Sequence, residues 1–161
     1  MDKQNFYDLN FDQLKNFLIE KVNVKNNKAK MRAQQMFNAV YKKNIKKFDE
    51  LTTFSLELRE KINELISLAK PKIVDIQKSK DGTIKFLLEL KDKRNVETVL
   101  IPDKSQSRYT ICLSVSVGCY LSCEFCATAQ ISKNLVRNLS PGEIISQIIL
   151  SKDYINDWST Q

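Results

Sequence analysis

The sequence predicts an α/β protein. A small N-terminal helical domain leads into a short antiparallel sheet and then into one strand–loop–helix (βα) unit. Three observations predict this order. Before residue 70 the apolar residues recur at helical spacing, and from residue 73 they alternate as in strands. After residue 105 come a strand, a cysteine-rich loop and a helix. The predicted domains are therefore residues 1–70, 71–104 and 105–161.

Three amphipathic segments make up the predicted helical domain. They cover residues 11–21, 30–43 and 55–69, and each carries one apolar stripe of the kind that faces a core. Asn10 is a suitable N-cap for the first helix, because its short side chain can accept a hydrogen bond from the first turn. Pro71 prevents the third helix from continuing.

The predicted sheet begins with a hairpin. Residues 73–79 and 83–90 flank a turn at Lys80-Asp81-Gly82, and residues 96–101 form a third strand that we expect to end at Pro102. These strands join the helical domain to the cysteine-containing part of the chain.

The clearest strand covers residues 109–117, where Cys112 is expected on the polar side. Gly118 ends this strand and the cysteine loop comes next. The helix after the loop begins at Ser140-Pro141-Gly142-Glu143, which has the form of a capping box. Its predicted buried stripe consists of isoleucines: Ile144, Ile145, Ile148 and Ile149. Chemistry in parallel α/β barrels sits at the carboxyl ends of the strands, where this cysteine loop lies.

Composition indicates a globular, cytoplasmic protein of 161 residues, 42% of them hydrophobic and 28% charged. No apolar run is long enough to span a membrane, and the first residues do not form a secretory signal. The net charge of +7 favours an anionic partner such as nucleic acid, although scattered lysines are equally consistent with a solvated surface. Clustered cysteines in a reducing compartment indicate metal binding or catalysis.

The most specific pattern is Cys119-x3-Cys123-x2-Cys126. Three thiolates on one loop can each hold one iron of a [4Fe–4S] cluster and leave the fourth iron open to a substrate. A zinc site that uses Cys112 as a fourth ligand is the metal-based alternative, and buried inert thiols are the other. The chain has no histidine, which removes the usual mixed zinc sites, and the spacing favours the cluster.

With Phe125 before its last cysteine, the loop resembles the radical S-adenosylmethionine signature. The flanking stretches SRYTICLSVSVGCYLSCEFCATAQ and RNLSPGEIISQ resemble the dual-specificity radical SAM rRNA/tRNA adenine-C2 methyltransferases, as do RAQQMF, DGTIKFLLEL and VETVLIP. The resemblance runs from about Lys30 onward and implies that residues 1–70 are an accessory domain that binds RNA. It implies that the last domain begins a radical SAM partial (β/α) barrel, and that Cys119, Cys123 and Cys126 bind one cluster whose open iron holds S-adenosylmethionine.

The same resemblance implies two catalytic residues. Cys112, in the motif TIC, occupies the position of the cysteine that resolves the protein–RNA intermediate and forms a transient disulfide. Glu97, in VETV, occupies the position of a proton-accepting carboxylate. From the residues alone, Cys112 would be a core thiol and Glu97 an exposed strand residue. In the family, a second cysteine near the C-terminus carries the methyl group.

The implied activity is methylation of adenine C2 in 23S rRNA and tRNA by a monomer with an electron donor such as flavodoxin or ferredoxin. The related C8-methylating enzymes are one alternative, and a non-enzymatic zinc- or RNA-binding module is another. The segment from Cys126 to Asn138 is slightly longer than in the family. The sequence up to Gln161 does not contain three features of the family: the GEP-type motif, the later barrel strands and the methyl-carrying cysteine. We therefore expect the chain to be an incomplete N-terminal part of such an enzyme, and to be inactive by itself.

Overall fold

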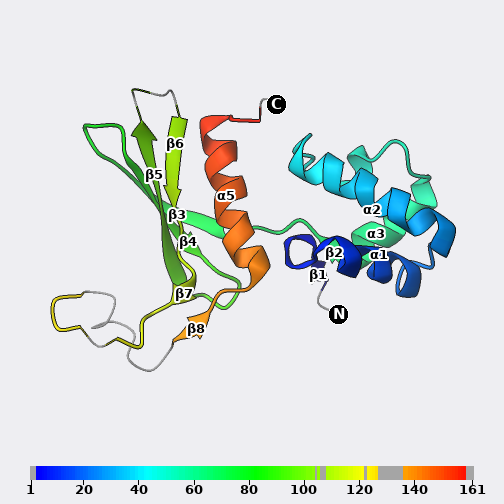
Figure 1. Cartoon of the computed structure of the whole chain (residues 1–161), viewed down its shortest axis with the longest axis horizontal. Helices are drawn as coiled ribbons and strands as arrows, with labels where there is room; N and C mark the ends of the chain where they lie inside the picture. Colours follow the sequence, from blue (N-terminus) through cyan, green and yellow to red (C-terminus); the bar gives the residue numbers. More distant parts are fainter. Residues whose placement is uncertain (1–2, 104, 106–107, 122, 127–135, 159–161) are drawn as a thin grey trace. The chain divides into compact units, whose positions relative to one another are not determined.

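The computed structural model describes residues 3–103, 105, 108–121, 123–126 and 136–158. The chain divides into two compact units, one made of residues 1–69 with 155–161 and the other of residues 70–154. The first unit is helical and the second is built on a sheet (Figure 1). In the described part of the chain, no helix combines the length and apolar character needed to cross a membrane.

The helical unit contains the three predicted helices: α1 (Phe11–Glu20), α2 (Asn26–Tyr41) and α3 (Leu56–Leu65). Two short 3-10 helices, Phe6–Asp8 and Phe48–Glu50, accompany them. The predicted cap of α1 is confirmed, because Asn10 and Gln13 form a reciprocal capping box. The prediction that the third helix extends to residue 69 is wrong. Residues Ile66–Ser67 instead form β2, which pairs in parallel with β1 (Gln4–Asn5).

An aromatic cluster forms the centre of the helical unit. Phe6 is fully buried, and its ring centroid lies 5.5 Å from that of Phe37, 5.8 Å from Tyr41 and 6.0 Å from Phe48. Rings at these separations gain attraction beyond the burial of their area. Because Phe6 lies before α1, the cluster ties the N-terminal segment to α2 and to the connection that precedes α3.

The second unit is a four-stranded antiparallel sheet in the order β3-β4-β5-β6. Its strands are β3 (Lys72–Lys78), β4 (Ile84–Glu89), β5 (Asn95–Asp103) and β6 (Arg108–Cys112). The predicted hairpin turn is present, with Gly82 at φ 96°, a conformation that glycine adopts without steric cost. The expectation that Pro102 ends the third strand is wrong, because β5 continues through Pro102, which pairs with Tyr109.

The predicted strand 109–117 is two strands. β6 ends at Cys112, and β7 (Ser116–Val117) pairs with β8 (Arg137–Asn138) in a separate two-stranded sheet. The intervening residues 113–115 belong to neither sheet, so the even alternation predicted across this stretch fails and the Val115 side chain is 63% exposed. Because β6 pairs with β5, the antiparallel sheet crosses the expected division at residue 104, and a separate barrel domain from residue 105 stays a prediction.

Helix α5 (Pro141–Ile155) covers one face of the four-stranded sheet (Figure 1). Its capping box is confirmed, since the Ser140 and Glu143 side chains each accept a hydrogen bond from the other residue's backbone N–H. The predicted isoleucine stripe is wrong except at Ile149. The buried positions of α5 are mainly small or polar: Gly142, Ser146, Gln147 and Ser151. This face of the helix therefore lies close to the sheet and hydrogen-bonds to it.

Candidate functional site

The strand register places the two predicted catalytic residues on one face of the sheet. Cys112 pairs with Val99, and Glu97 lies two residues before Val99 on β5. Because alternate residues of a strand share a face, Glu97 and Cys112 lie on the same side. Thr98 and Leu100 point the other way and are fully buried on the side of α5. We call the side with Glu97 and Cys112 the open face and the side under α5 the closed face.

Glu97 is an accessible carboxylate held by a neighbouring cation. Its Oε1 lies 3.0 Å from Lys85 Nζ, and its side chain is 54% exposed. Lys85 pairs with Val99 in the register and therefore also lies on the open face. Cys112 is an exposed thiol. The open face thus offers a carboxylate, an ammonium group and a thiol to a molecule that approaches the sheet.

Gln147, the last residue of the stretch RNLSPGEIISQ, was given no role from the sequence, and it fixes the chain just after Cys112. It is fully buried, accepts hydrogen bonds from Thr98 Oγ1 (2.8 Å) and Ser114 N–H (2.9 Å), and donates to the Ser114 carbonyl (2.9 Å). One amide side chain thereby satisfies both backbone groups of Ser114, as a neighbouring strand would do. The only sign of this role in the sequence is that Gln147 interrupts the isoleucine-rich pattern of α5.

Ser114 extends this network back to the catalytic candidates, because its hydroxyl donates a 2.7 Å hydrogen bond to the Glu97 carbonyl oxygen. The backbone between Cys112 and Val115 is therefore tied to β5 at Glu97 and to α5 at Gln147. A buried polar network whose donors and acceptors are all hydrogen-bonded makes the surrounding structure rigid. The network fixes the chain directly after the end of β6.

The cysteine loop begins at Gly118, which has a φ of 69°. Cys119 Sγ accepts a 3.4 Å hydrogen bond from the Leu121 N–H, and the Cys126 N–H donates to the Cys123 carbonyl at 3.1 Å. The three cysteines are half-buried, whereas the Phe125 side chain is 93% exposed. The loop therefore presents thiols and aromatic surface without burying either.

The base of the loop is closed by an ion-pair cluster centred on Arg137 of β8. Its Nη1 and Nη2 each lie 2.8 Å from a Glu143 carboxylate oxygen, and its Nε lies 2.8 Å from Asp92 Oδ2. Hydrogen bonds from Arg137 lower the pKa of Asp92 and of Glu143, and the two carboxylates raise the pKa of Arg137. We call this cluster the Arg137 clamp. It joins β8 to the start of α5 and to the turn between β4 and β5.

The donor chemistry of the loop suits an iron–sulfur cluster, but the described side chains do not form a closed metal site. All four cysteines, each within the described residues, are thiols and not disulfides. A backbone N–H bonded to Cys119 sulfur is the kind of contact that tunes cluster ligands. Among the described residues, no group of three or more cysteine or carboxylate side chains is gathered closely enough to hold a metal ion. The slightly longer segment expected after Cys126 includes residues 127–135, which lie outside the described residues.

Comparisons with known proteins agree with this architecture. Residues 4–68 match the family described as ribosomal RNA large subunit methyltransferase N-terminal domain. The chain is 42% identical over 149 residues to the dual-specificity RNA methyltransferase RlmN of Oleidesulfovibrio alaskensis, covering 92% of this chain and 40% of the relative. It is 40% identical over 160 residues to RlmN of Campylobacter fetus, covering 92% and 42%.

A solved structure gives the same result at the level of the fold. A radical SAM methyltransferase from Sphaerobacter thermophilus superposes with a TM-score of 0.79 at 30% identity, covering 96% of this chain and 43% of that protein. The chain thus spans about 40% of the length of the curated relatives it matches. Sequence and structure together show that the chain belongs to the RlmN family and matches the N-terminal portion of its members.

Proposed function

We propose that this chain serves a radical S-adenosylmethionine methyltransferase that methylates C2 of adenine in 23S rRNA and tRNA. The observation that carries the proposal is the placement of the four cysteines. Cys119, Cys123 and Cys126 share one loop whose base is clamped, while Cys112 lies apart on the open face of the sheet. This division supports a cluster with three protein ligands and a separate reactive thiol.

In this proposal Cys119, Cys123 and Cys126 hold one [4Fe–4S] cluster. When bound, the cluster supplies the electron for reductive cleavage of S-adenosylmethionine, with a donor of the flavodoxin or ferredoxin class as its source. Adenine C2 is not nucleophilic, so it does not accept a methyl group by ordinary transfer. The protein's own task is to orient the reactants and to exclude water from them.

Cys112 and Glu97 carry the residue chemistry of the proposal. The Cys112 thiol is accessible on β6, where it could form a transient disulfide with the family's second, methyl-carrying cysteine as the bond from that cysteine's sulfur to the transferred carbon breaks and the methylated RNA is released. The Glu97 carboxylate is on the same face and is exposed, so it can accept the proton that leaves C2. Lys85, whose Nζ lies 3.0 Å from Glu97 Oε1, orients this carboxylate on the open face. Gln147 and Ser114 fix the backbone that follows Cys112 and tie it to Glu97.

Anaerobic reconstitution tests the cluster. The chain incubated with iron and sulfide should give bound iron, bound sulfide and charge-transfer absorbance in the visible range. One tightly bound zinc without iron would instead support a zinc-binding module and contradict the proposal. A cytoplasmic protein is expected, since its thiols must stay reduced. The family resemblance is the basis for expecting a monomer.

The position of methylation is tested in cells. Disruption of the gene that encodes this chain should remove 2-methyladenosine from 23S rRNA and tRNA, as measured by mass spectrometry of the nucleosides. Loss of 8-methyladenosine, with 2-methyladenosine unchanged, would instead identify the related C8-methylating activity.

A further inference from the structure

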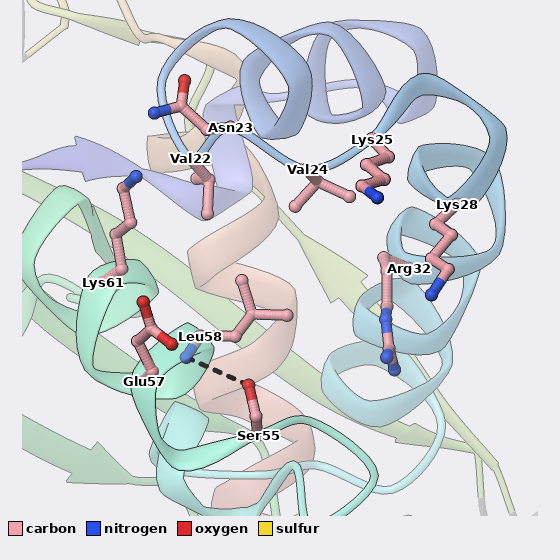
Figure 2. Close-up of a pocket in the computed structure, with 10 residues that line it drawn as sticks. All are labelled: Val22, Asn23, Val24, Lys25, Lys28, Arg32, Ser55, Glu57, Leu58 and Lys61. Carbon is pink, nitrogen blue, oxygen red and sulfur yellow. Dashed lines mark hydrogen bonds between the residues drawn. The ribbon is translucent and has the colours of Figure 1, made fainter.

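A pocket in the helical unit lies between the start of α2 and the start of α3. Its volume is about 340 Å³, at the lower end of the range for small-molecule sites. Figure 2 shows Val22, Val24 and Leu58 between Lys61 on one side and Lys28 with Arg32 on the other. The pocket therefore has an apolar floor and a basic rim. We call it the α2–α3 pocket.

The rim carries a clear excess of positive charge. Lys25, Lys28, Arg32 and Lys61 line the pocket, and Glu57 is the one carboxylate among the lining residues. Within the described part of the chain, the lysine ammonium groups have no hydrogen-bond or ion-pair partner. Cations that are gathered around a cavity and left unpaired favour an anionic ligand.

Arg32 differs from the three lysines, because the fold holds it in place. Its Nη1 donates to the Thr53 carbonyl and to Gln35 Oε1, both at 3.0 Å, and its guanidinium lies 4.6 Å from the centre of the Phe54 ring. A guanidinium fixed by such contacts is a preorganised partner for a phosphate group. The rim thus combines one ordered cation with three flexible ones.

The start of α2 adds to the positive potential. Its N-cap residue, Lys25, makes no side-chain capping bond, and the first turn has no acidic residue, whereas α1 and α3 have both. Lysine side chains near the N-terminus of a helix are electrostatically unfavourable, because that end of the helix carries a partial positive charge. A bound anion at the rim would relieve this repulsion, which supports the assignment made from the cavity and its side chains.

We propose that the α2–α3 pocket binds one phosphate-bearing nucleotide of single-stranded RNA. The phosphate would contact the lysines and Arg32, and the base would lie on Val22, Val24 and Leu58. A base that is stacked or paired within a helix cannot contact the apolar side chains of the pocket, so the pocket fits an unpaired nucleotide. The choice of RNA as the polymer rests on the proposed function. The anion site itself rests on the lining residues alone.

Binding of a short, fluorescently labelled single-stranded RNA by anisotropy tests the proposal without iron or S-adenosylmethionine. The double variant Lys28→Gln/Lys61→Gln removes one cation from each side of the pocket. Its matched control is Lys72→Gln/Lys80→Gln, which removes the same charge from exposed lysines of the sheet unit. The pocket variant should bind roughly ten-fold more weakly than the control, and its logarithmic salt dependence should fall by about 0.7 for each lost phosphate contact.

Equal affinity of the two double variants would overturn the proposal. Circular dichroism checks that both are folded, and amide chemical shifts of the wild-type chain provide a second measurement. Adenosine monophosphate should shift the amides of residues 22–32 and 55–61 at lower concentration than inorganic phosphate does. Equal shifts by the two ligands would show a bare anion site and would contradict base binding. RNA binding at the pocket by a chain that takes up no cluster would sustain this inference while the proposed function fails.

Discussion

The two faces of the four-stranded sheet use the same strands for different purposes. On the closed face Phe86, Leu88 and Leu100 are at most 1% exposed and lie under α5. On the open face Glu97 and Cys112, the proposed catalytic residues, are exposed. Because neighbouring residues in a strand alternate between faces, the residues that stabilise the sheet and those with a proposed chemical role lie one residue apart. Substitutions on the two faces should therefore have separable effects.

Truncation of Phe86 should show the largest difference between the faces. Phe86 is 1% exposed, and its ring centroid lies 5.0 Å from that of Tyr154 on α5. Phe86→Ala should cost about 3–5 kcal/mol, because it removes buried area and leaves a cavity. The neighbouring Leu87→Ala, on the open face, should cost about 1 kcal/mol. Urea unfolding followed by circular dichroism measures both, and equal losses would contradict the division into two faces.

Replacement of Gln147 should have the next largest effect. Gln147→Leu keeps the side-chain volume but leaves the Ser114 N–H and carbonyl without their partner. We expect a loss of about 2–3 kcal/mol and faster hydrogen exchange at the Ser114 amide, since each orphaned polar group costs about 1–3 kcal/mol. Gln77→Leu, in an exposed position on β3, is the matched control. Unchanged exchange at Ser114 in Gln147→Leu would show that the network does not hold this segment.

The Arg137 clamp should contribute about 1 kcal/mol, since solvent screens its more exposed Asp92 contact. The pKa values of Asp92 and Glu143 are lowered in the folded protein by hydrogen bonds from Arg137. Their contribution is therefore complete above the unfolded carboxyl pKa of about 4, and it is lost as the pH falls through the lowered folded values.

Arg137→Gln should accordingly be less stable than the wild type at pH 7 and similar to it near pH 2. Arg108→Gln is the control, because it breaks an exposed ion pair with Asp103. Thermal unfolding across this pH range measures the difference. A gap between Arg137→Gln and the wild type that persists at pH 2 would mean that the clamp acts through packing and not through charge.

The smallest effect on stability is expected at Glu97. Glu97→Gln removes an ion pair in which the two side chains are 38% and 54% exposed, so it should change stability by less than about 0.5 kcal/mol. Thermal unfolding at neutral pH measures this change, with Lys85→Gln as the partner variant. A loss above about 1 kcal/mol in Glu97→Gln would show that the open face also supports the fold.

The helices and the hairpin could be predicted from the sequence, because their signals are local. Asn10 and Gln13 lie three residues apart, and Gly82 lies in the turn that requires it. The break after Cys112 could not be predicted, since it depends on Gln147, which is distant in the chain. The residues on the buried side of α5 were predicted wrongly for the same reason, since they also depend on contacts with distant parts of the chain. Gln147 is buried there because Thr98 of the sheet and the backbone of Ser114 bind its side chain.

The candidate site was predictable in its residue types and not in its arrangement. The cysteine spacing alone indicated a cluster loop, and the alternating pattern around Cys112 predicted its position on a strand. Glu97 has no local signal beyond its resemblance to the family. The Arg137 clamp depends on contacts with Asp92 and Glu143 that come together only in the folded chain.

The most direct test of the central claim is iron uptake by single cysteine variants. The chain is reconstituted anaerobically, its iron and sulfide are counted, and Mössbauer spectra are recorded. The wild type and Cys112→Ala should each take up about four iron ions in a [4Fe–4S] cluster. Cys119→Ala, Cys123→Ala and Cys126→Ala should each lose it. An equal loss in Cys112→Ala, or a cluster retained without any one of the three loop cysteines, would contradict the account.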